Sequence, residues 1–407
     1  EHPYLYDLNI TLSSEGQQTD AVKSYCGMRK IEVKNVDGTP RIFLNDTQIF
    51  QMGPLDQGWW PDGLYTAPSD EALLFDIKAM KELGFNMIRK HIKVEPSRWY
   101  MHCDREGILV WQDLPSPNLP AGHEAFARQN FEEEAVRIID AFENHPSIVQ
   151  WVVFNEGWGQ FDTERMTQVV IDKVSPQSLV CCASGWNDAE IGDIKDSHSY
   201  PYPSCPIDQK RACVNGEYGG ITLKVPGHIW PGGDFGYTAV ETPEDFTVMF
   251  NDLADKIKDH YYYGLNAAVY TQLSDVEIEK NGIYTYDRRI LKPYSPTGEL
   301  KDKILECINM PQSDVKIQPV VSTAKEHKYK WKFITEDNAP RHWFSKGFDD
   351  SLWPKGTAAF GKSSLWNTQG LISIPWTTPQ IYMRRWFYLG DVTQEMIDCM
   401  RFMIYHD

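Results

Sequence analysis

Hydrophobic and polar residues follow two different rhythms along the chain, and the rhythm changes twice. Residues 1–35 alternate with a period of two in stretches such as YLYDLNITL, which predicts short β-strands. From about residue 42 to residue 307, apolar strand-like runs alternate with segments whose apolar residues recur at helical spacing. From residue 329 the chain is again β-like, with aromatic runs punctuated by Gly, Pro and Asp.

The middle region predicts a series of strands and helices. Ser69 is a good N-cap for the first helix, and Gly84 is typical of the residue that follows a helix. We expect strands at residues 48–53, 86–91, 108–113, 149–155, 179–183, 196–200, 212–216 and 267–273, and helices at residues 70–83, 96–106, 131–143, 163–175, 243–263 and 298–307. Eight strands alternating with helices over roughly 250 residues are typical of a (β/α)8 TIM barrel, an α/β fold. A doubly wound sheet is the rival prediction, but no glycine-rich phosphate loop follows an early strand.

The changes of rhythm also predict the domain organisation. We expect residues 1–35 to be the end of a β-sandwich, residues 36–310 the barrel, residues 311–328 a polar linker, and residues 329–407 an incomplete β-sandwich. The chain starts without Met or a signal peptide, as expected of a sequence that begins within a longer protein. It therefore gives no targeting signal, and we expect a periplasmic or extracellular location rather than a cytoplasmic one.

Composition restricts the partners. A net charge of −17 argues against nucleic acid and against an anionic membrane surface, because both attract basic proteins. No run of 18 apolar residues is present, so we expect no membrane insertion. Fourteen Trp and 20 Tyr residues suit a core, but flat rings also pack on the apolar face of a sugar. Assembly into a homo-oligomer is left open.

Two glutamates stand out as candidates for chemistry. The apolar run 149–154 ends at Asn155-Glu156, and we expect the apolar surround to raise the pKa of this glutamate, as a catalytic acid requires. Glu217 follows the seventh predicted strand. The alternatives are an ordinary strand-to-loop junction at Glu156 and a strand cap at Glu217. Further polar residues lie at or just past predicted strand ends, which share one face of a barrel: His91, Asp113, Asn155, His198, Tyr200 and Gln272.

A pair of carboxylates facing one cleft is what glycoside hydrolysis requires. One protonates the leaving oxygen, and the other attacks the anomeric carbon or activates water. Carboxyl groups about 5–5.5 Å apart imply retention of configuration through a covalent intermediate, and a larger separation implies inversion. The sequence alone leaves that separation open.

The motifs DIKAMKELGFNMIRKH, WYMHCDREGILVWQD, HPSIVQWVVFNEGWG and VNGEYGG make the chain resemble glycoside hydrolase family 2 from residue 36 to about residue 300. This family contains β-galactosidases, β-glucuronidases and β-mannosidases. The resemblance implies a retaining enzyme with Glu156 as the acid/base, Glu217 as the nucleophile and Asn155 bonded to the sugar 2-hydroxyl. It also implies that His91 lines the sugar site and that Tyr200 lies near the nucleophile. Residues 1–35 are similar to the end of the family's immunoglobulin-like domain, and the last segment to the opening of its sugar-binding jelly roll.

The sequence departs from the family pattern in two places near the expected site. Thr271 and Gln272 stand where the family carries a Trp near the end of the eighth strand, and Trp158 could supply a sugar platform instead. Trp59 and Trp60 could do the same, and a core or rim position is the alternative for each. Where β-glucuronidases have an Asn-x-Lys pair that grips the substrate carboxylate, this chain reads EKNG at residues 279–282. A Glu at position 279 would repel a uronic acid, which favours a neutral sugar.

No cofactor is required by this chemistry. His91 and His198 lack metal-ligand spacing, so we expect no metal centre, although the family resemblance leaves room for Mg²⁺ or Na⁺ near Asp113. We predict a retaining exo-β-glycosidase acting on a neutral oligosaccharide or glycoside, above all a β-galactoside. A β-glucuronidase or β-mannosidase is the alternative within the family. A catalytically silent carbohydrate-binding barrel and a metal hydrolase built on the two histidines are the alternatives from other classes.

Overall fold

The computed structural model describes residues 3–116, 122, 124–312, 324, 327–335, 339–361, 372–388, 390–394 and 400. The chain divides into two compact units, residues 1–313 and residues 314–407. This division lies within the expected linker, most of which falls outside the described residues. Each unit is considered by itself.

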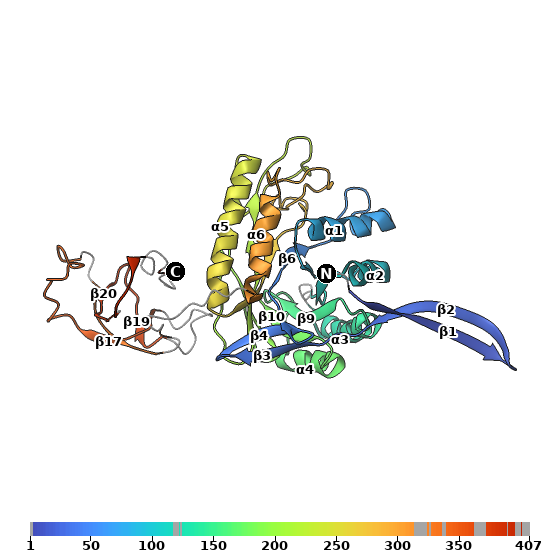
Figure 1. Cartoon of the computed structure of the whole chain (residues 1–407), viewed down its shortest axis with the longest axis horizontal. Coiled ribbons are helices and arrows are strands. Elements are labelled where there is room, and N and C mark those ends of the chain that lie inside the picture. Colours follow the sequence, from blue (N-terminus) through green and yellow to red (C-terminus); the bar gives the residue numbers. More distant parts are fainter. Residues whose placement is uncertain are drawn as a thin grey trace. The chain divides into compact units, whose positions relative to one another are not determined.

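The first unit is built on eight parallel strands that form a nearly closed barrel (Figure 1). In sheet order they are β10 (Leu179–Ser184), β9 (Ile148–Asn155), β8 (Leu109–Asp113), β7 (Met87–Lys90), β6 (Gln51–Asp56), β15 (Leu265–Thr271), β12 (Ala212–Gly219) and β11 (Ile194–His198). Two hydrogen bonds show that the edge strands approach each other. The Asp193 N–H donates to the Val180 carbonyl at 2.9 Å, and Ser184 Oγ donates to Asp196 Oδ2 at 2.6 Å. The (β/α)8 prediction is confirmed.

Among the described residues of this unit, six α-helices cover the outside of the barrel. They are α1 (Asp70–Glu82), α2 (Ser97–Glu106), α3 (Glu124–Phe142), α4 (Thr163–Val174), α5 (Pro243–Tyr262) and α6 (Glu299–Ile308). The last two lie side by side in Figure 1. Ser69 caps the first helix as expected, since its side chain accepts the Ala72 N–H at 3.2 Å. No helix among the described residues combines the length and apolar character needed to span a bilayer.

Apolar residues form two separate cores in this unit. One lies inside the barrel and includes Leu55, Met87, Trp111 and Val152. The other lies between the strands and the surrounding helices and is the larger. This double burial explains why strand β9 is buried along its whole length and reads as a continuous apolar run.

The N-terminal end of the barrel is covered by an antiparallel sheet of β3 (Ile31–Val36), β4 (Thr39–Leu44) and β5 (Thr47–Gln48). Ile31 and Ile42 join the core inside the barrel. Arg41 fixes this sheet by donating to the carbonyls of Leu265 and Tyr261 at 2.9 and 2.8 Å. The boundary expected after residue 35 therefore falls inside a strand that pairs with the next one.

A long hairpin of β1 (Leu5–Ser14) and β2 (Gln17–Gly27) extends from the barrel (Figure 1). Its base is attached through Tyr25, whose hydroxyl donates to Asp104 Oδ2 at 2.6 Å. Every second residue of the first strand is apolar and exposed, including Tyr6, Leu8 and Ile10. Such an apolar face is typical of a strand pair that other strands cover, and the β-sandwich assignment of this segment stays a prediction.

Two short strands complete the first unit, β13 (Ile221–Thr222) and β14 (Thr238–Ala239), and a 3-10 helix follows at Met310–Gln312. The second unit contains β16 (Lys330–Ile334), β17 (Lys355–Thr357), β18 (Phe360–Gly361), β19 (Ile374–Pro375) and β20 (Tyr382–Arg384). Strand β16 pairs antiparallel with β17 and β20. Asp350 accepts from Lys332 and Arg384 beside this sheet. Its assignment as an incomplete sugar-binding sandwich stays a prediction.

Candidate active site

The polar residues singled out from the sequence come together at the C-terminal ends of the barrel strands. Asn155 and His198 are the last residues of their strands, Glu156 and His91 directly follow β9 and β7, and Glu217 lies near the end of β12. Because parallel barrel strands end on one face, these side chains converge although they come from distant parts of the sequence.

Glu156 is held in a left-handed backbone conformation, with φ of 52°. Such a conformation is unfavourable for a residue with a Cβ and persists where the surroundings impose it. Here the Glu156 N–H donates to the Ser184 carbonyl at 3.0 Å, and Trp186 Nε1 donates to the Glu156 carbonyl at 2.9 Å. The turn directs the Glu156 carboxylate towards its neighbours. The side chain is 21% exposed, so a substrate can reach it.

His198 lies between the two glutamates. Its Nδ1 is 2.8 Å from Glu156 Oε1 and 3.5 Å from Glu217 Oε2, and its Nε2 is 2.7 Å from Ser184 Oγ. A carboxylate oxygen of Glu156, one of Glu217 and a ring nitrogen of His198 all lie within 4.8 Å of one another. The two carboxylates therefore face a common point.

The electrostatics of this cluster correct one expectation. Burial raises the pKa of Glu156, but the hydrogen bond and charge of His198 outweigh burial, so the pKa lies below its ordinary value of 4.5 rather than above it. Burial lowers the pKa of His198, but the charge of Glu217 and the hydrogen bond to Glu156 raise it by more. The pKa of His198 therefore lies above its ordinary value of 6.5. The histidine therefore tends to keep its proton and the glutamate to lose it.

Glu217 is bound by two donors. The Tyr200 hydroxyl donates to Glu217 Oε2 at 2.7 Å, and Arg89 Nη1 lies 3.3 Å from Glu217 Oε1. Tyr200 is itself fixed by stacking on Tyr237, with ring centroids 3.6 Å apart, and by a 2.8 Å contact with Thr271 Oγ1. Donors on both oxygens stabilise and orient an ionised carboxylate.

Arg89 joins most of these residues into one network. It is fully buried and donates to both oxygens of Asp113, at 2.9–3.2 Å, to Asn155 Oδ1 at 2.8 Å and to the Gly216 carbonyl at 2.9 Å. His91 Nδ1 lies 3.0 Å from the same Asp113 carboxylate. Asp113 is only 1% exposed, so it positions His91 and Arg89 instead of facing a substrate.

Gln272, which directly follows β15, is hydrogen-bonded to Glu279. Gln272 is buried, and its Nε2 donates to Glu279 Oε2 at 2.7 Å and to Asn281 Oδ1 at 2.8 Å, while Gln57 Nε2 donates to Gln272 Oε1 at 3.0 Å. Burial, and then the charge of Glu217, raise the pKa of Glu279. Lys280 donates to the Gly233 carbonyl at 2.9 Å and pairs with Asp234. This lysine is therefore engaged by other groups.

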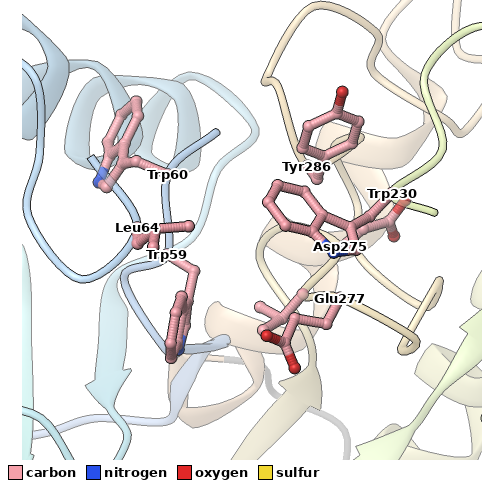
Figure 2. Close-up of a pocket in the computed structure, with 8 residues that line it drawn as sticks. Trp59, Trp60, Leu64, Trp230, Asp275, Glu277 and Tyr286 are labelled. Atoms are coloured by element: carbon pink, nitrogen blue, oxygen red, sulfur yellow. The ribbon is translucent and has the colours of Figure 1, made fainter. Parts of the chain in front are cut away.

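The candidate tryptophans differ in position. Trp158 is half exposed, and its Nε1 is 3.5 Å from Glu156 Oε2, so it borders the carboxylates. Trp59 and Trp60 line a separate pocket with Trp230 and Tyr286 (Figure 2). That pocket does not include either glutamate.

A metal ion near Asp113 does not fit these contacts. Both oxygens of the Asp113 carboxylate already accept hydrogen bonds from Arg89, and His91 Nδ1 contacts one of them. The positive charge beside the carboxylate is therefore a guanidinium. His91 and His198 also belong to different clusters: the candidate metal-ligand group among the described residues consists of Glu156, His198 and Glu217.

Sequence reasoning gave no role to Arg89, Ser184, Trp186 or Tyr237. Arg89 was detectable, since an arginine inside a four-residue buried strand needs anionic partners. The sequence singled out Glu279 only because its charge would repel a uronic acid. Ser184, Trp186 and Tyr237 act through tertiary contacts, which have no local signal in the sequence.

Comparison with known proteins identifies the barrel. Residues 67–305, more than half of the chain, match the family model described as glycosyl hydrolases family 2, TIM barrel domain. A β-glucuronidase of Bacteroides fragilis is 28% identical over 166 residues, which cover 38% of this chain and 23% of the relative. A β-galactosidase of Lactococcus lactis is 29% identical over 167 residues, covering 39% of this chain and 16% of the relative. The chain thus spans less than a quarter of the length of these relatives.

A solved structure gives the same fold. The family 2 β-galacturonidase of Eisenbergiella tayi bound to glycerol superposes with a TM-score of 0.59 at 17% identity, covering 75% of this chain and 58% of that one. At this identity the likeness bears on architecture only.

Proposed function

The chain belongs to glycoside hydrolase family 2, and from this premise we propose that it is a retaining exo-β-glycosidase that removes terminal neutral sugars, with β-galactosides as the first candidates. The observation that carries the proposal is that one carboxylate oxygen of Glu156 lies within 4.8 Å of one carboxylate oxygen of Glu217. Retaining glycosidases hold their carboxyl groups about 5–5.5 Å apart, whereas inverting enzymes need about 6.5–9.5 Å to admit a water.

The two glutamates take different roles. Glu217 attacks the anomeric carbon as the bond to the leaving oxygen breaks, and Glu156 supplies the proton that this oxygen takes up. In the second step Glu156 accepts a proton from water, the water oxygen bonds to the anomeric carbon, and Glu217 is released. The donors from Tyr200 and Arg89 support the nucleophile assignment, because they contact both oxygens of Glu217 and so hold its carboxylate in one orientation.

His198 explains how Glu156 can act as an acid despite its lowered pKa. In this hydrogen-bonded pair the pKa of His198 is raised and that of Glu156 is lowered, which favours the proton on the histidine. The Nδ1–Oε1 distance of 2.8 Å allows transfer to Glu156 as negative charge develops on the leaving oxygen. His198 is thus a positioning residue that stores the proton.

The proposal of a neutral sugar rests on charge. The charge of Glu217 acts on Glu279, so Glu279 adds a third carboxylate close to the site, and Lys280 is paired with Asp234. A uronic acid would place a fourth carboxylate there without a free lysine to receive it.

A panel of p-nitrophenyl β-glycosides tests the proposal. We expect turnover of the galactoside to exceed that of the mannoside and the glucuronide, and Glu156→Gln or Glu217→Gln to reduce kcat at least about a thousandfold. Glu134→Gln, an exposed change on α3, is the matched control and should have no effect. NMR of the first-formed product should show the β anomer. Sugar binding without turnover would instead favour a silent carbohydrate-binding barrel, and α-anomer formation would exclude retention.

A further inference from the structure

The hydroxyl of Tyr200 contacts the nucleophile and is itself held in place. It donates to Glu217 Oε2 at 2.7 Å, and its oxygen lies 2.8 Å from Thr271 Oγ1. Because the single Tyr200 proton is used on Glu217, Thr271 is the donor in the second contact. A hydroxyl that accepts one hydrogen bond donates the next more strongly. The orientation of the Tyr200 ring therefore bears directly on the Glu217 carboxylate.

Tyr237, the residue before β14, covers one face of that ring. The two rings are parallel to within 3°, and their centroids are 3.6 Å apart. Tyr237 is 44% exposed, so burial in the core does not account for its position. Gly220 leaves room for the stack, because a Cβ there would clash with the Tyr237 ring and lie 3.3 Å from Tyr200 Cδ1.

The backbone is fixed on both sides of Tyr237. The Phe235 N–H donates to the Ile278 carbonyl at 3.0 Å. On the other side, Thr238 pairs with Ile221 in the two-stranded sheet of β13 and β14. The ring of Tyr237 is therefore presented by an anchored segment of chain.

These contacts close a ring that begins and ends at the nucleophile. From Glu217 the chain runs directly to Ile221, which pairs with Thr238. From there the connection passes to the neighbouring Tyr237 and through the stack to Tyr200. The hydrogen bond from Tyr200 to Glu217 completes it. A closed ring of contacts leaves the carboxylate little freedom to turn.

We propose that Tyr237 is a positioning residue for the nucleophile: its ring holds the Tyr200 hydroxyl on Glu217 and so fixes the direction from which the carboxylate attacks. The inference rests on the proposed function, in which Glu217 bonds to the anomeric carbon. It assigns the effect to the ring of Tyr237, so the hydroxyl of this residue is dispensable. The alternative is that the Tyr237 hydroxyl binds the sugar directly.

The test measures how fast Glu217 is labelled by a 2-deoxy-2-fluoro-β-glycosyl fluoride of the sugar that the wild type turns over fastest. Glu217 bonds to the anomeric carbon as fluoride leaves with the bonding electrons, and fluoride needs no proton from Glu156. We expect Tyr237→Leu to slow labelling about tenfold to a hundredfold, as for the loss of a hydrogen bond to a charged group. It should lower kcat with KM nearly unchanged. Tyr237→Phe keeps the ring and should keep most of the rate.

A double-mutant cycle separates positioning from a general loss of structure. In the Tyr200→Phe background no hydroxyl is left to hold, so Tyr237→Leu should cause little further loss. Tyr294→Leu, at a tyrosine of similar exposure (52%), is the matched control and should leave the labelling rate unchanged.

Three results would overturn the inference. They are an unchanged labelling rate in a folded Tyr237→Leu protein, a loss in Tyr237→Phe as large as in Tyr237→Leu, and the same proportional loss with and without the Tyr200 hydroxyl. If Tyr237→Leu does not fold, Tyr237→Met, whose flexible side chain adapts to gaps, takes its place with the same expectations. If the wild type is neither labelled nor active on any β-glycoside, the proposed function itself fails. That outcome is distinct from a labelled wild type with unaffected variants.

Discussion

At the scale of single residues, the site depends on one buried cation that holds several polar side chains in place. Arg89 contacts Asp113, Asn155 and Glu217 at once, so it fixes the nucleophile and the residue before the acid in one geometry. Arginine suits this role because its planar guanidinium carries several donors in a fixed arrangement. A lysine at position 89 could not satisfy these partners together.

The His198–Glu156 pair leads to a prediction about pH. The raised pKa of His198 contributes to the stability of the fold. This contribution is fully present below pH 6.5, the ordinary pKa of histidine, and it is lost as the pH rises through the raised pKa. The lowered pKa of Glu156 contributes stability that is present above pH 4.5, the ordinary pKa of glutamate. This contribution is lost as the pH falls through the lowered pKa. We therefore expect the melting temperature of the wild type to exceed that of His198→Gln by more at pH 6 than at pH 9. A difference that grows towards pH 9 would contradict the assigned charges.

The same residues show what a sequence can predict at this scale. Glu156 and Glu217 were detectable because each lies close to the C-terminal end of a buried strand, where a carboxylate is unusual. The pKa of Glu156 was not predictable, because it is set by His198, 42 residues further along the chain. Trp186 likewise reaches Glu156 only through the folded loop.

At the scale of elements, the helices and strands were largely predictable because each has its own periodicity. Ser69 and the apolar spacing located α1 from the sequence. The start of α3 was missed by seven residues, since the exposed first two turns carry no apolar stripe. Strand β11 begins and ends two residues earlier than expected.

Gly53 supplies the prediction that belongs to this scale. A Cβ at this position of β6 would lie 1.7 Å from the Met87 carbonyl of β7. We expect Gly53→Ala to force these strands apart and to destabilise the protein by about 1–3 kcal/mol or more, measured by urea denaturation. Because Arg89 lies two residues beyond Met87, kcat should fall as well. Gly233→Ala, where a Cβ meets nothing within 4 Å, is the control, and similar stability losses in both variants would refute the steric argument.

At the scale of the whole molecule, the order of strands and helices predicted the barrel, and the barrel placed the candidate site at one face. The flanking β segments were recognised from their alternation, but their domain assignments remain predictions. Each presents incomplete sheets among the described residues, such as the two-stranded hairpin of β1 and β2 with its exposed apolar face. Periodicity indicates which face of a strand is apolar, but it does not identify what covers that face.

The net charge of −17 gives the last prediction, because it acts at long range on a charged substrate while Glu279 acts at contact. Screening shortens the Debye length from about 30 Å at 0.01 M salt to about 10 Å at 0.1 M, so kcat/KM for a β-glucuronide should rise severalfold over this range. The neutral β-galactoside should show no such rise. Glu279→Gln should increase the glucuronide-to-galactoside ratio of kcat/KM at every salt concentration, and Glu134→Gln should leave it unchanged. A glucuronide that is the better substrate at low salt would exclude the preference for neutral sugars.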